Sequence, residues 1–232
     1  LDLGIPGPDL DFGAGRLRVD VEAPALRTVV NPSVRPVRAT ARLAIEATDA
    51  GQVVTWALLI DGIRRRSGRV GSEVLDLRFG TRDLADGTHT VAVEVGDAVG
   101  NLGRRTWRVT TDNTLPTLAI DQIVVRPAAA VRVAGRNRRQ FPVAVTLTSA
   151  DTISRTLIVD VSLTKLPRGP GRSRRIVMTS GVAGNIGLGR FAPGAYLLRV
   201  VATDRAGNRR TVAQRIAVRA PRLESPAPIT QN

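Results

Sequence analysis

Side chains suited to acid–base or nucleophilic chemistry are scarce in this chain. His89 is the only histidine, and there is no cysteine. A hydrolytic triad needs a general base beside its nucleophile, and no Gly-x-Ser-x-Gly motif accompanies His89. One histidine without cysteine does not supply the ligand set of a transition-metal site. The sequence therefore predicts no catalytic residue and no cofactor, and it favours a structural role for His89.

Carboxylate and amide side chains gather at predicted turns, where their oxygens are of the type that binds calcium. The candidate calcium ligands are Asp97, Asp112, Asn113 and Asp204, with Asn101 and Asn208 nearby in the chain. No Asp-x-Asp-x-Asp-Gly loop occurs, and aspartates in turns usually accept hydrogen bonds from their own backbone. The sequence favours this structural role and leaves calcium as the alternative.

Arginine supplies nearly all of the positive charge. The net charge is +14, Lys165 is the only lysine, and residues 112–232 carry +13 of the total. Codon usage that favours arginine explains the excess, but not its concentration in one half. The clusters there, which we take as candidate polyanion-binding residues, are Arg136, Arg138, Arg139, Arg172, Arg174, Arg175, Arg209 and Arg210.

Arginines on one face would bind the phosphate or carboxylate groups of a cell-wall polymer or another polyanion. Nucleic acid is disfavoured because aromatic side chains that stack on bases are nearly absent beside them. Arg64–Arg66 form a further cluster in the first half, and the cluster at 168–175 lies in a predicted Pro/Gly/Arg loop. Solvated arginines on hairpin loops are the default interpretation.

An internal repeat indicates the architecture. Residues 86–101, DGTHTVAVEVGDAVGN, align without gaps with residues 193–208, PGAYLLRVVATDRAGN. Each copy alternates apolar and polar residues, which is typical of a half-buried strand, and ends in a D-x-x-G-N turn. A repeat near a hundred residues predicts tandem copies of a whole domain rather than a solenoid.

The other periodic segments are also strand-like, and no capped amphipathic helix or membrane-spanning segment is predicted. Strands are expected at 41–48, 53–61, 73–79, 104–111, 141–149, 154–164 and 209–219, and Asp61-Gly62 is a hairpin turn signal. The sequence predicts an all-β fold of two tandem Ig-like/fibronectin-III-like antiparallel β-sandwiches joined by a short linker. The expected domains are 21–111 and 112–220, followed by a flexible tail at 221–232.

Three aromatic positions refine this prediction. Tyr196 follows Gly194 at the start of the penultimate strand, where a tyrosine corner would lie, and His89 takes the same place in the first copy. Trp56 and Trp107 alternate with Leu58 and Val109, which predicts that both indoles face the core. Inward tryptophans weigh against a glycan-binding platform without removing it.

Two resemblances extend the interpretation. The G-x-Y-x-L-x-V-x-A-x-D-x-A-G-N pattern and the junction DNTLPT at 112–117 resemble the tandem Ig-like domains of bacterial surface and secreted proteins. Residues 2–16, DLGIPGPDLDFGAGR, resemble the closing phrase of a subtilisin-like serine protease domain. Residues 1–20 would then be the end of that domain. The family's Asp, His and Ser motifs are not in this sequence, so no catalytic residue is carried over.

These resemblances imply a non-catalytic accessory region of a secreted bacterial subtilisin-like serine protease. The sandwiches would act as spacer, stabiliser or tether to substrate or cell envelope, outside the cell or on its surface. The catalytic domain of the same polypeptide would be their partner. The alternatives are a cell-surface adhesion or structural array, and a polyanion- or glycan-binding module.

Overall fold

The computed structural model describes residues 20–50, 52–127, 129–133 and 136–219. It contains fifteen β-strands and a single 3-10 turn at Pro32–Val34, and within these residues no α-helix forms. None of the described helical segments is long and apolar enough to cross a membrane. Residues 1–19 of the predicted protease-domain end and linker (1–20), and the predicted tail at 221–232, lie outside the described residues.

The described residues divide into two compact units. Unit one consists of residues 20–33, 42–79 and 89–109, and unit two consists of residues 34–41, 80–88 and 110–219. Unit two therefore includes two short segments, 34–41 and 80–88, besides the continuous stretch that begins at residue 110.

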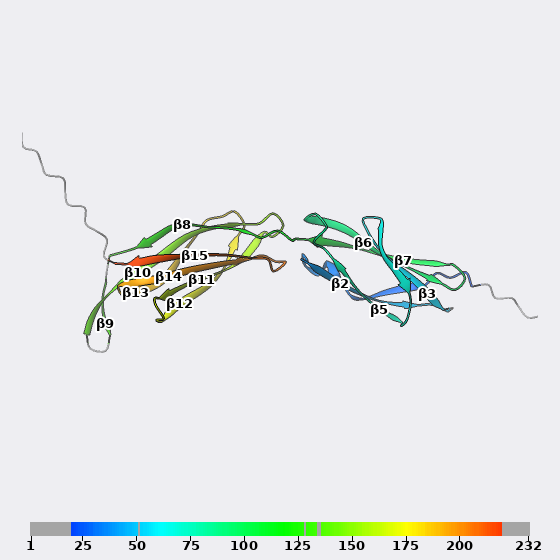
Figure 1. The fold of residues 1–232 in the computed structure, drawn as a ribbon, viewed down its shortest axis with the longest axis horizontal. Coiled ribbons are helices and arrows are strands. Elements are labelled where there is room, and N and C mark those ends of the chain that lie inside the picture. The colour runs from blue at the N-terminus through cyan, green and yellow to red at the C-terminus, as the bar shows by residue number, and fades with distance from the viewer. Residues whose placement is uncertain (1–19, 51, 128, 134–135, 220–232) are drawn as a thin grey trace, which may run out of the picture. The chain divides into compact units, whose positions relative to one another are not determined.

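The first seven strands form two antiparallel sheets. One has the strand order β1-β2-β5 and the other the order β4-β3-β6-β7 (Figure 1). The strands are β1 (Ala25–Val30), β2 (Thr40–Thr48), β3 (Val53–Ile60), β4 (Ile63–Arg69), β5 (Val74–Gly80), β6 (Gly87–Asp97) and β7 (Leu102–Thr111).

The remaining strands repeat this arrangement. One sheet has the order β8-β10-β13, with β9 paired to the long strand β10, and the other has the order β12-β11-β14-β15 (Figure 1). The strands are β8 (Thr117–Val125), β9 (Ala129–Val133), β10 (Arg136–Ala150), β11 (Thr156–Lys165), β12 (Gly171–Thr179), β13 (Gly184–Phe191), β14 (Gly194–Thr203) and β15 (Arg209–Val218).

In a fibronectin-III sandwich, a sheet of three strands packs against a sheet of four, and the fourth strand along the chain pairs with the third. Both halves of the chain have this arrangement, which confirms the predicted all-β class and the two sandwiches. The repeated segments become β6 and β14. Their turns also agree, because Gly100 and Gly207 take positive φ values of 98° and 91°, which glycine adopts without steric cost.

Strand alternation builds the cores as predicted. Val91, Val93 and Val95 of β6 are fully buried, and Leu198 and Val200 of β14 are buried in the same way. From Phe141 to Leu147 of β10, and along β11, the residues alternate likewise, so that every second side chain of these stretches enters the core of the second sandwich. Packing of branched aliphatic side chains between the sheets is the main favourable contribution to folding here, since the chain has no disulfide.

The two predicted corner positions hold the chain in different ways. The hydroxyl of Tyr196 donates to the carbonyl of Ala192 at 2.9 Å, so the tyrosine corner is confirmed. In the other copy, Nδ1 of His89 lies 2.6 Å from the Asp61 carboxylate, which also accepts the amide of Thr90. Asp61 and Gly62 form the predicted hairpin turn, with φ values of 51° and 79°.

The two tryptophans differ in burial. Trp107 is buried and its Nε1 lies 3.3 Å from the hydroxyl oxygen of Thr28, as an inward-facing residue should be. Trp56 is only half-buried, and its Nε1 donates to the carbonyl of Arg69 at 3.2 Å. The prediction that Trp56 faces the core therefore needs correction: its indole lies against the edge strand β4, where Gly68 leaves room for the ring.

The prediction of a loop at 168–175 was wrong for most of that segment. Residues from Gly171 onward form β12, which pairs with β11 from Thr164↔Gly171 to Thr156↔Thr179. Because β12 is an edge strand, its side chains stay exposed at many positions, and this gives the sequence a loop-like composition.

Candidate functional site

The segment that leads into β8 is held by the turn after β14. We call residues 112–116 and the corresponding residues 20–24 the lead-in segments. The side-chain amide of Asn208 donates to the backbone carbonyl of Asp112 at 2.8 Å. The turn itself is closed by Asp204, whose Oδ1 accepts the amides of Gly207 and Asn208 at 2.7 and 2.8 Å. The D-x-x-G-N motif therefore positions a neighbouring segment as well as its own turn.

Unit one repeats this contact at the equivalent place. The side-chain amide of Asn101 donates to the backbone carbonyl of Asp20 at 3.2 Å and to Oδ2 of Asp97 at 2.7 Å. Oδ1 of Asp97 accepts the amides of Val99, Gly100 and Asn101. Two copies of the motif, 107 residues apart, thus hold a lead-in segment by the same donor.

Each contact brings three carboxylates together. Acidic cluster one consists of Asp20, Asp49 and Asp97, and acidic cluster two consists of Asp112, Asp151 and Asp204. Within each cluster, one oxygen of every carboxylate lies within 4.8 Å of the others. The three members come from the lead-in segment, from the residue after β2 or β10, and from the end of β6 or the residue after β14.

Cluster two is the more deeply buried. Asp112 is fully buried and Asp204 is 5% exposed, and Oδ2 of each is a buried atom without a hydrogen-bond partner. Burial, together with the negative charges of Asp151, Asp204 and Asp86, raises the pKa of Asp112 to about 7, and the Ser154 hydroxyl offsets a smaller part of this rise. Without a bound cation, Asp112 is therefore partly protonated near neutral pH.

The corresponding turn aspartate of cluster one behaves differently. Burial alone would raise the pKa of Asp97, but hydrogen bonds from the Asn101 side chain and from three backbone amides lower it overall. Oδ2 of Asp49 is a buried oxygen without a hydrogen-bond partner, although Asp49 as a whole is half-buried. Both clusters thus contain at least one carboxylate oxygen that no donor of the described residues satisfies.

Three of the four sequence-based calcium candidates lie in these clusters, namely Asp97, Asp112 and Asp204. Asn113 lies elsewhere, because its Oδ1 accepts the amide of Ala39 and the hydroxyl of Thr81. The backbone amide of Asn113 donates to Oδ1 of Asp86 at 2.6 Å. Asn101 and Asn208 present amide nitrogens, not oxygens, to their lead-in segments.

Sequence reasoning missed Asp20, Asp49 and Asp151. A signal for them existed: Asp20-Val21-Glu22-Ala23-Pro24 matches Asp112-Asn113-Thr114-Leu115-Pro116 at both the aspartate and the proline. Asp49 and Asp151 each directly follow an equivalent strand. The separation in sequence differs between the equivalent aspartates Asp20 and Asp112, Asp49 and Asp151, and Asp97 and Asp204. A gapless alignment therefore finds only the last pair.

The arginine clusters are distributed over several edges. Arg172, Arg174 and Arg175 lie exposed on β12, and Arg64–Arg66 lie exposed on β4, the equivalent edge strand of the first sandwich. Charged side chains on an edge strand discourage pairing with another chain. This role explains why both sandwiches carry arginines on the same strand.

Strand alternation separates the β12 arginines further. Arg175 forms a two-point ion pair with Asp160, with distances of 2.7 and 3.1 Å. Because successive side chains of a strand point to opposite sides, Arg172 and Arg174 lie on the other side of β12 from Arg175. The guanidinium of Arg172 lies 5.9 Å from the ring centre of Phe191. Arg172 and Arg174 are therefore the pair on β12 that shares one side.

The other predicted arginines lie on different strands. Arg209 and Arg210 are exposed at the start of β15, at the opposite edge of the sheet from β12. Arg136, Arg138 and Arg139 belong to β10 where it pairs with β9, and Arg139 is exposed. Strand order thus brings Arg172 and Arg174 together but does not unite them with Arg209 and Arg210.

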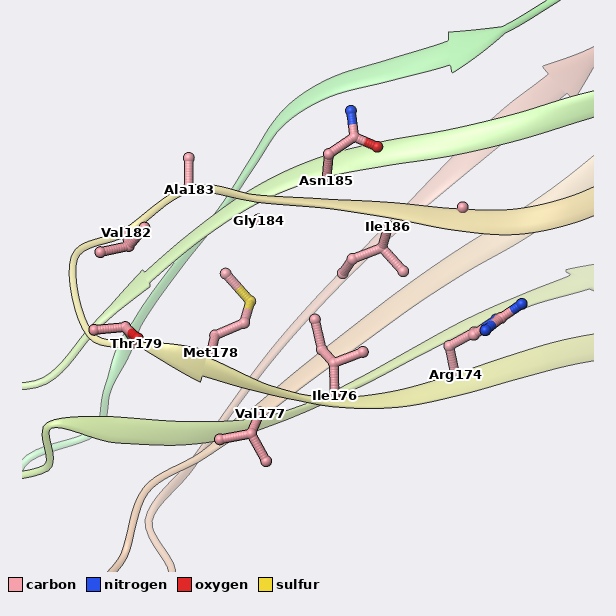
Figure 2. A pocket seen from close by; sticks show the side chains of 11 residues that line it. Arg174, Ile176, Val177, Met178, Thr179, Val182, Ala183, Gly184, Asn185 and Ile186 are labelled. Carbon is pink, nitrogen blue, oxygen red and sulfur yellow. The ribbon is translucent and has the colours of Figure 1, made fainter.

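A shallow groove of about 380 Å³ lies between β12 and β13. Figure 2 shows Ile176 and Met178 of β12 and Ile186 of β13 pointing toward one another, whereas Val177 and Asn185 point away. Arg174 lines one end of this groove. The floor is the edge of the hydrophobic core, since Met178 and Ile186 are buried core residues.

Comparison with known proteins finds similar solved structures at low sequence identity. No family model matches the chain, and no curated protein sequence is similar to it. The fibronectin(III)-like modules of Clostridium thermocellum CbhA are 13% identical, with a TM-score of 0.45, over 88% of this chain and 98% of theirs.

Two adhesins are similar in the same way. A tetra-tandem repeat from the extending region of a large adhesion protein is 20% identical, with a TM-score of 0.41, over 86% of this chain and 50% of that one. A 1.5-MDa bacterial ice-binding adhesin is 14% identical, with a TM-score of 0.43, over 84% of this chain and 64% of that one. The solved structures similar to this chain thus include fibronectin-III-like and adhesin modules of bacteria.

Proposed function

We propose that this chain is the non-catalytic accessory region of a secreted bacterial subtilisin-like serine protease. The two sandwiches space, stabilise or tether the catalytic domain near its substrate or the cell envelope, outside the cell or on its surface. The catalytic domain precedes them in the same polypeptide. The resemblance of residues 2–16 to the end of such a domain motivates the choice of partner.

The equivalent lead-in segments support the spacing role most directly. Asn101 holds the carbonyl of Asp20 as Asn208 holds the carbonyl of Asp112. Unit one thus holds its lead-in segment as unit two does. A spacer needs this property, because a held lead-in limits how freely the preceding part of the chain moves against the sandwich.

The polypeptide encoded by the whole gene tests this proposal. We expect the reading frame ahead of Leu1 to contain the Asp, His and Ser motifs of a subtilisin-like domain. Deleting residues 21–220 should leave cleavage of a short soluble peptide unchanged, while shortening the thermal half-life of the protease or its retention on cell envelopes. A frame without the three motifs would remove the proposal, and so would a deletion that changes neither property.

A surface adhesion or structural array is the second candidate. The repetition of one strand order in succession favours it, because arrays extend by adding copies of a sandwich. Further copies of the D-x-x-G-N motif ahead of Leu1, in place of protease motifs, would establish the array and exclude the protease.

A polyanion-binding module is the third candidate. The exposed pair Arg172 and Arg174 at the β12 edge, in the half of the chain that carries a net charge of +13, favours it. A glycan platform of aromatic side chains has less support, since Trp107 is buried and Trp56 is half-buried.

A further inference from the structure

We propose that acidic cluster two binds a calcium ion through Asp112, Asp151 and Asp204, and that acidic cluster one binds a second ion through Asp20, Asp49 and Asp97. This inference does not depend on the proposed function, because it concerns a property of the two sandwiches themselves.

Two buried carboxylate oxygens of acidic cluster two lack a hydrogen-bond partner. Buried polar atoms in proteins nearly always have a partner, and a buried anion without one is costly. Asp112 is fully buried and Asp204 is 95% buried, yet Oδ2 of each accepts no hydrogen bond. Both oxygens belong to carboxylates of the same cluster, so a single cation placed between them would satisfy both.

Neither acidic cluster forms a salt bridge with a cationic side chain of the described residues. The chain contains 33 arginines, but none of the salt bridges formed by the described residues involves either cluster. The charges acting most strongly on Asp112 are instead those of Asp151, Asp204 and Asp86, all negative. Like charges gathered in a buried position are destabilising unless a cation neutralises them.

The spacing and chemical type of the cluster oxygens fit calcium. Ca²⁺ binds oxygen at about 2.3–2.6 Å, so two oxygens on one ion lie at most about 5 Å apart. The cluster oxygens lie within 4.8 Å of one another, and all are carboxylate oxygens. Neither cluster contains the histidine or cysteine that zinc prefers. This donor set matches calcium better than a softer metal.

A cluster of three carboxylates occurs in each sandwich. In both sandwiches the three carboxylates occupy the lead-in segment, the residue after β2 or β10, and the end of β6 or the residue after β14. An ion there would cross-link three segments that are distant in sequence. It would fix the lead-in segment to the loops at one end of its own sandwich, adding to the bond from Asn101 or Asn208.

The test is calcium binding by the whole chain after treatment with EDTA. Calorimetric titration with CaCl₂ should give two ions per chain. Saturation at a hundredfold excess over the dissociation constant should raise the unfolding midpoint by roughly 10 °C. Equal concentrations of MgCl₂ should raise it far less, and matched ionic strength in NaCl should not raise it.

Conservative variants then assign the sites. Asp204→Asn and Asp97→Asn should each remove one bound ion, whereas Asp121→Asn, which changes an exposed carboxylate on β8, should remove none. Asp151→Asn is a second test of cluster two that alters a less buried member, in case Asp204→Asn does not fold. If Asp97→Asn leaves the number of bound ions unchanged while Asp204→Asn lowers it, cluster one is not a calcium site; the reverse result would exclude cluster two.

Three results would overturn the proposal as a whole. The first is no binding at millimolar CaCl₂ by the folded native chain. The second is an equal rise of the midpoint with MgCl₂ or NaCl. The third is unchanged stoichiometry in Asp204→Asn, Asp151→Asn and Asp97→Asn, which would place the ions elsewhere.

Discussion

Asn208 donates its side-chain amide to the backbone carbonyl of Asp112 at 2.8 Å, across 96 residues of sequence. Asn101 does the same to Asp20, 81 residues earlier in the chain. Because the acceptor is a backbone carbonyl, the contact fixes the path of the lead-in segment whichever side chains that segment carries. The turn motif that looks local in the sequence is therefore a long-range clamp in both units.

Removing this clamp should destabilise the second unit. Asn208 is 2% exposed, so Asn208→Ala leaves the Asp112 carbonyl buried without its donor. We expect a loss of about 1–3 kcal/mol in the free energy of unfolding, measured by urea denaturation. Asn185→Ala, which alters an exposed asparagine on β13, serves as control. Equal stability of the two variants would show that the clamp contributes nothing.

The tyrosine corner offers a second stability test. Tyr196→Phe keeps the ring, which meets Phe191 edge-on at 5.5 Å, and removes only the hydroxyl bond to Ala192. The expected loss is about 0.5–1.5 kcal/mol. Tyr196→Ala also removes the packed ring and should cost about 3–5 kcal/mol. If thermal unfolding gives the same loss for both variants, the ring packing is not the larger contribution.

The fold was predictable because it depends on local patterns. Alternating Val91, Val93 and Val95 indicate a strand, and the gapless repeat indicates a second copy. Asp61-Gly62 indicates a hairpin, and the left-handed φ values of these two residues confirm it. Each of these features involves neighbouring residues, which a single sequence displays directly.

The acidic clusters were only partly predictable because they depend on contacts between distant segments. Asp204 can be recognised in the sequence because it begins a D-x-x-G-N turn. Asp151 is an isolated aspartate after a strand, and only the fold brings it beside Asp112. The loop predicted at 168–175 failed for a related reason. Arg172 and Arg174 have the composition of a loop, and pairing with β11 makes their segment a strand.

Stability should depend on pH through Asp112 when calcium is removed. Its pKa is about 7 in the folded chain against an ordinary value of 3.8, so the folded state holds a proton that the unfolded state releases. Stability should therefore fall as the pH rises from about 4 to about 7, by roughly 2–4 kcal/mol, and stay low above that range. Urea denaturation in EDTA across this range measures the effect.

Two other aspartates with shifted pKa values contribute outside this window. Asp61 and Asp76 accept hydrogen bonds from His89 and Arg42 that lower their pKa values, so their contributions to stability are lost only below the ordinary aspartate range. Asp112→Asn should flatten the profile between pH 4 and 7, and saturating calcium should flatten it too. A profile in EDTA that rises with pH over this window would contradict the account.

The arginine edge predicts a salt-dependent interaction. Retention of the whole chain on an immobilised polycarboxylate should weaken with NaCl, since each contact is an exposed ion pair. Arg172→Ser with Arg174→Ser should lower the salt needed for elution. Arg64→Ser with Arg66→Ser on the equivalent strand β4 is the matched control, and removes the same formal charge from unit one. Identical shifts for both pairs would mean that net charge alone governs retention.

Anomalous diffraction from crystals grown in CaCl₂ locates the bound ions without relying on any variant. The account predicts two peaks. One should lie among the carboxylates of Asp112, Asp151 and Asp204, and the other among those of Asp20, Asp49 and Asp97. Peaks confined to other positions, or none at either cluster while the carboxylates keep these distances, would contradict it.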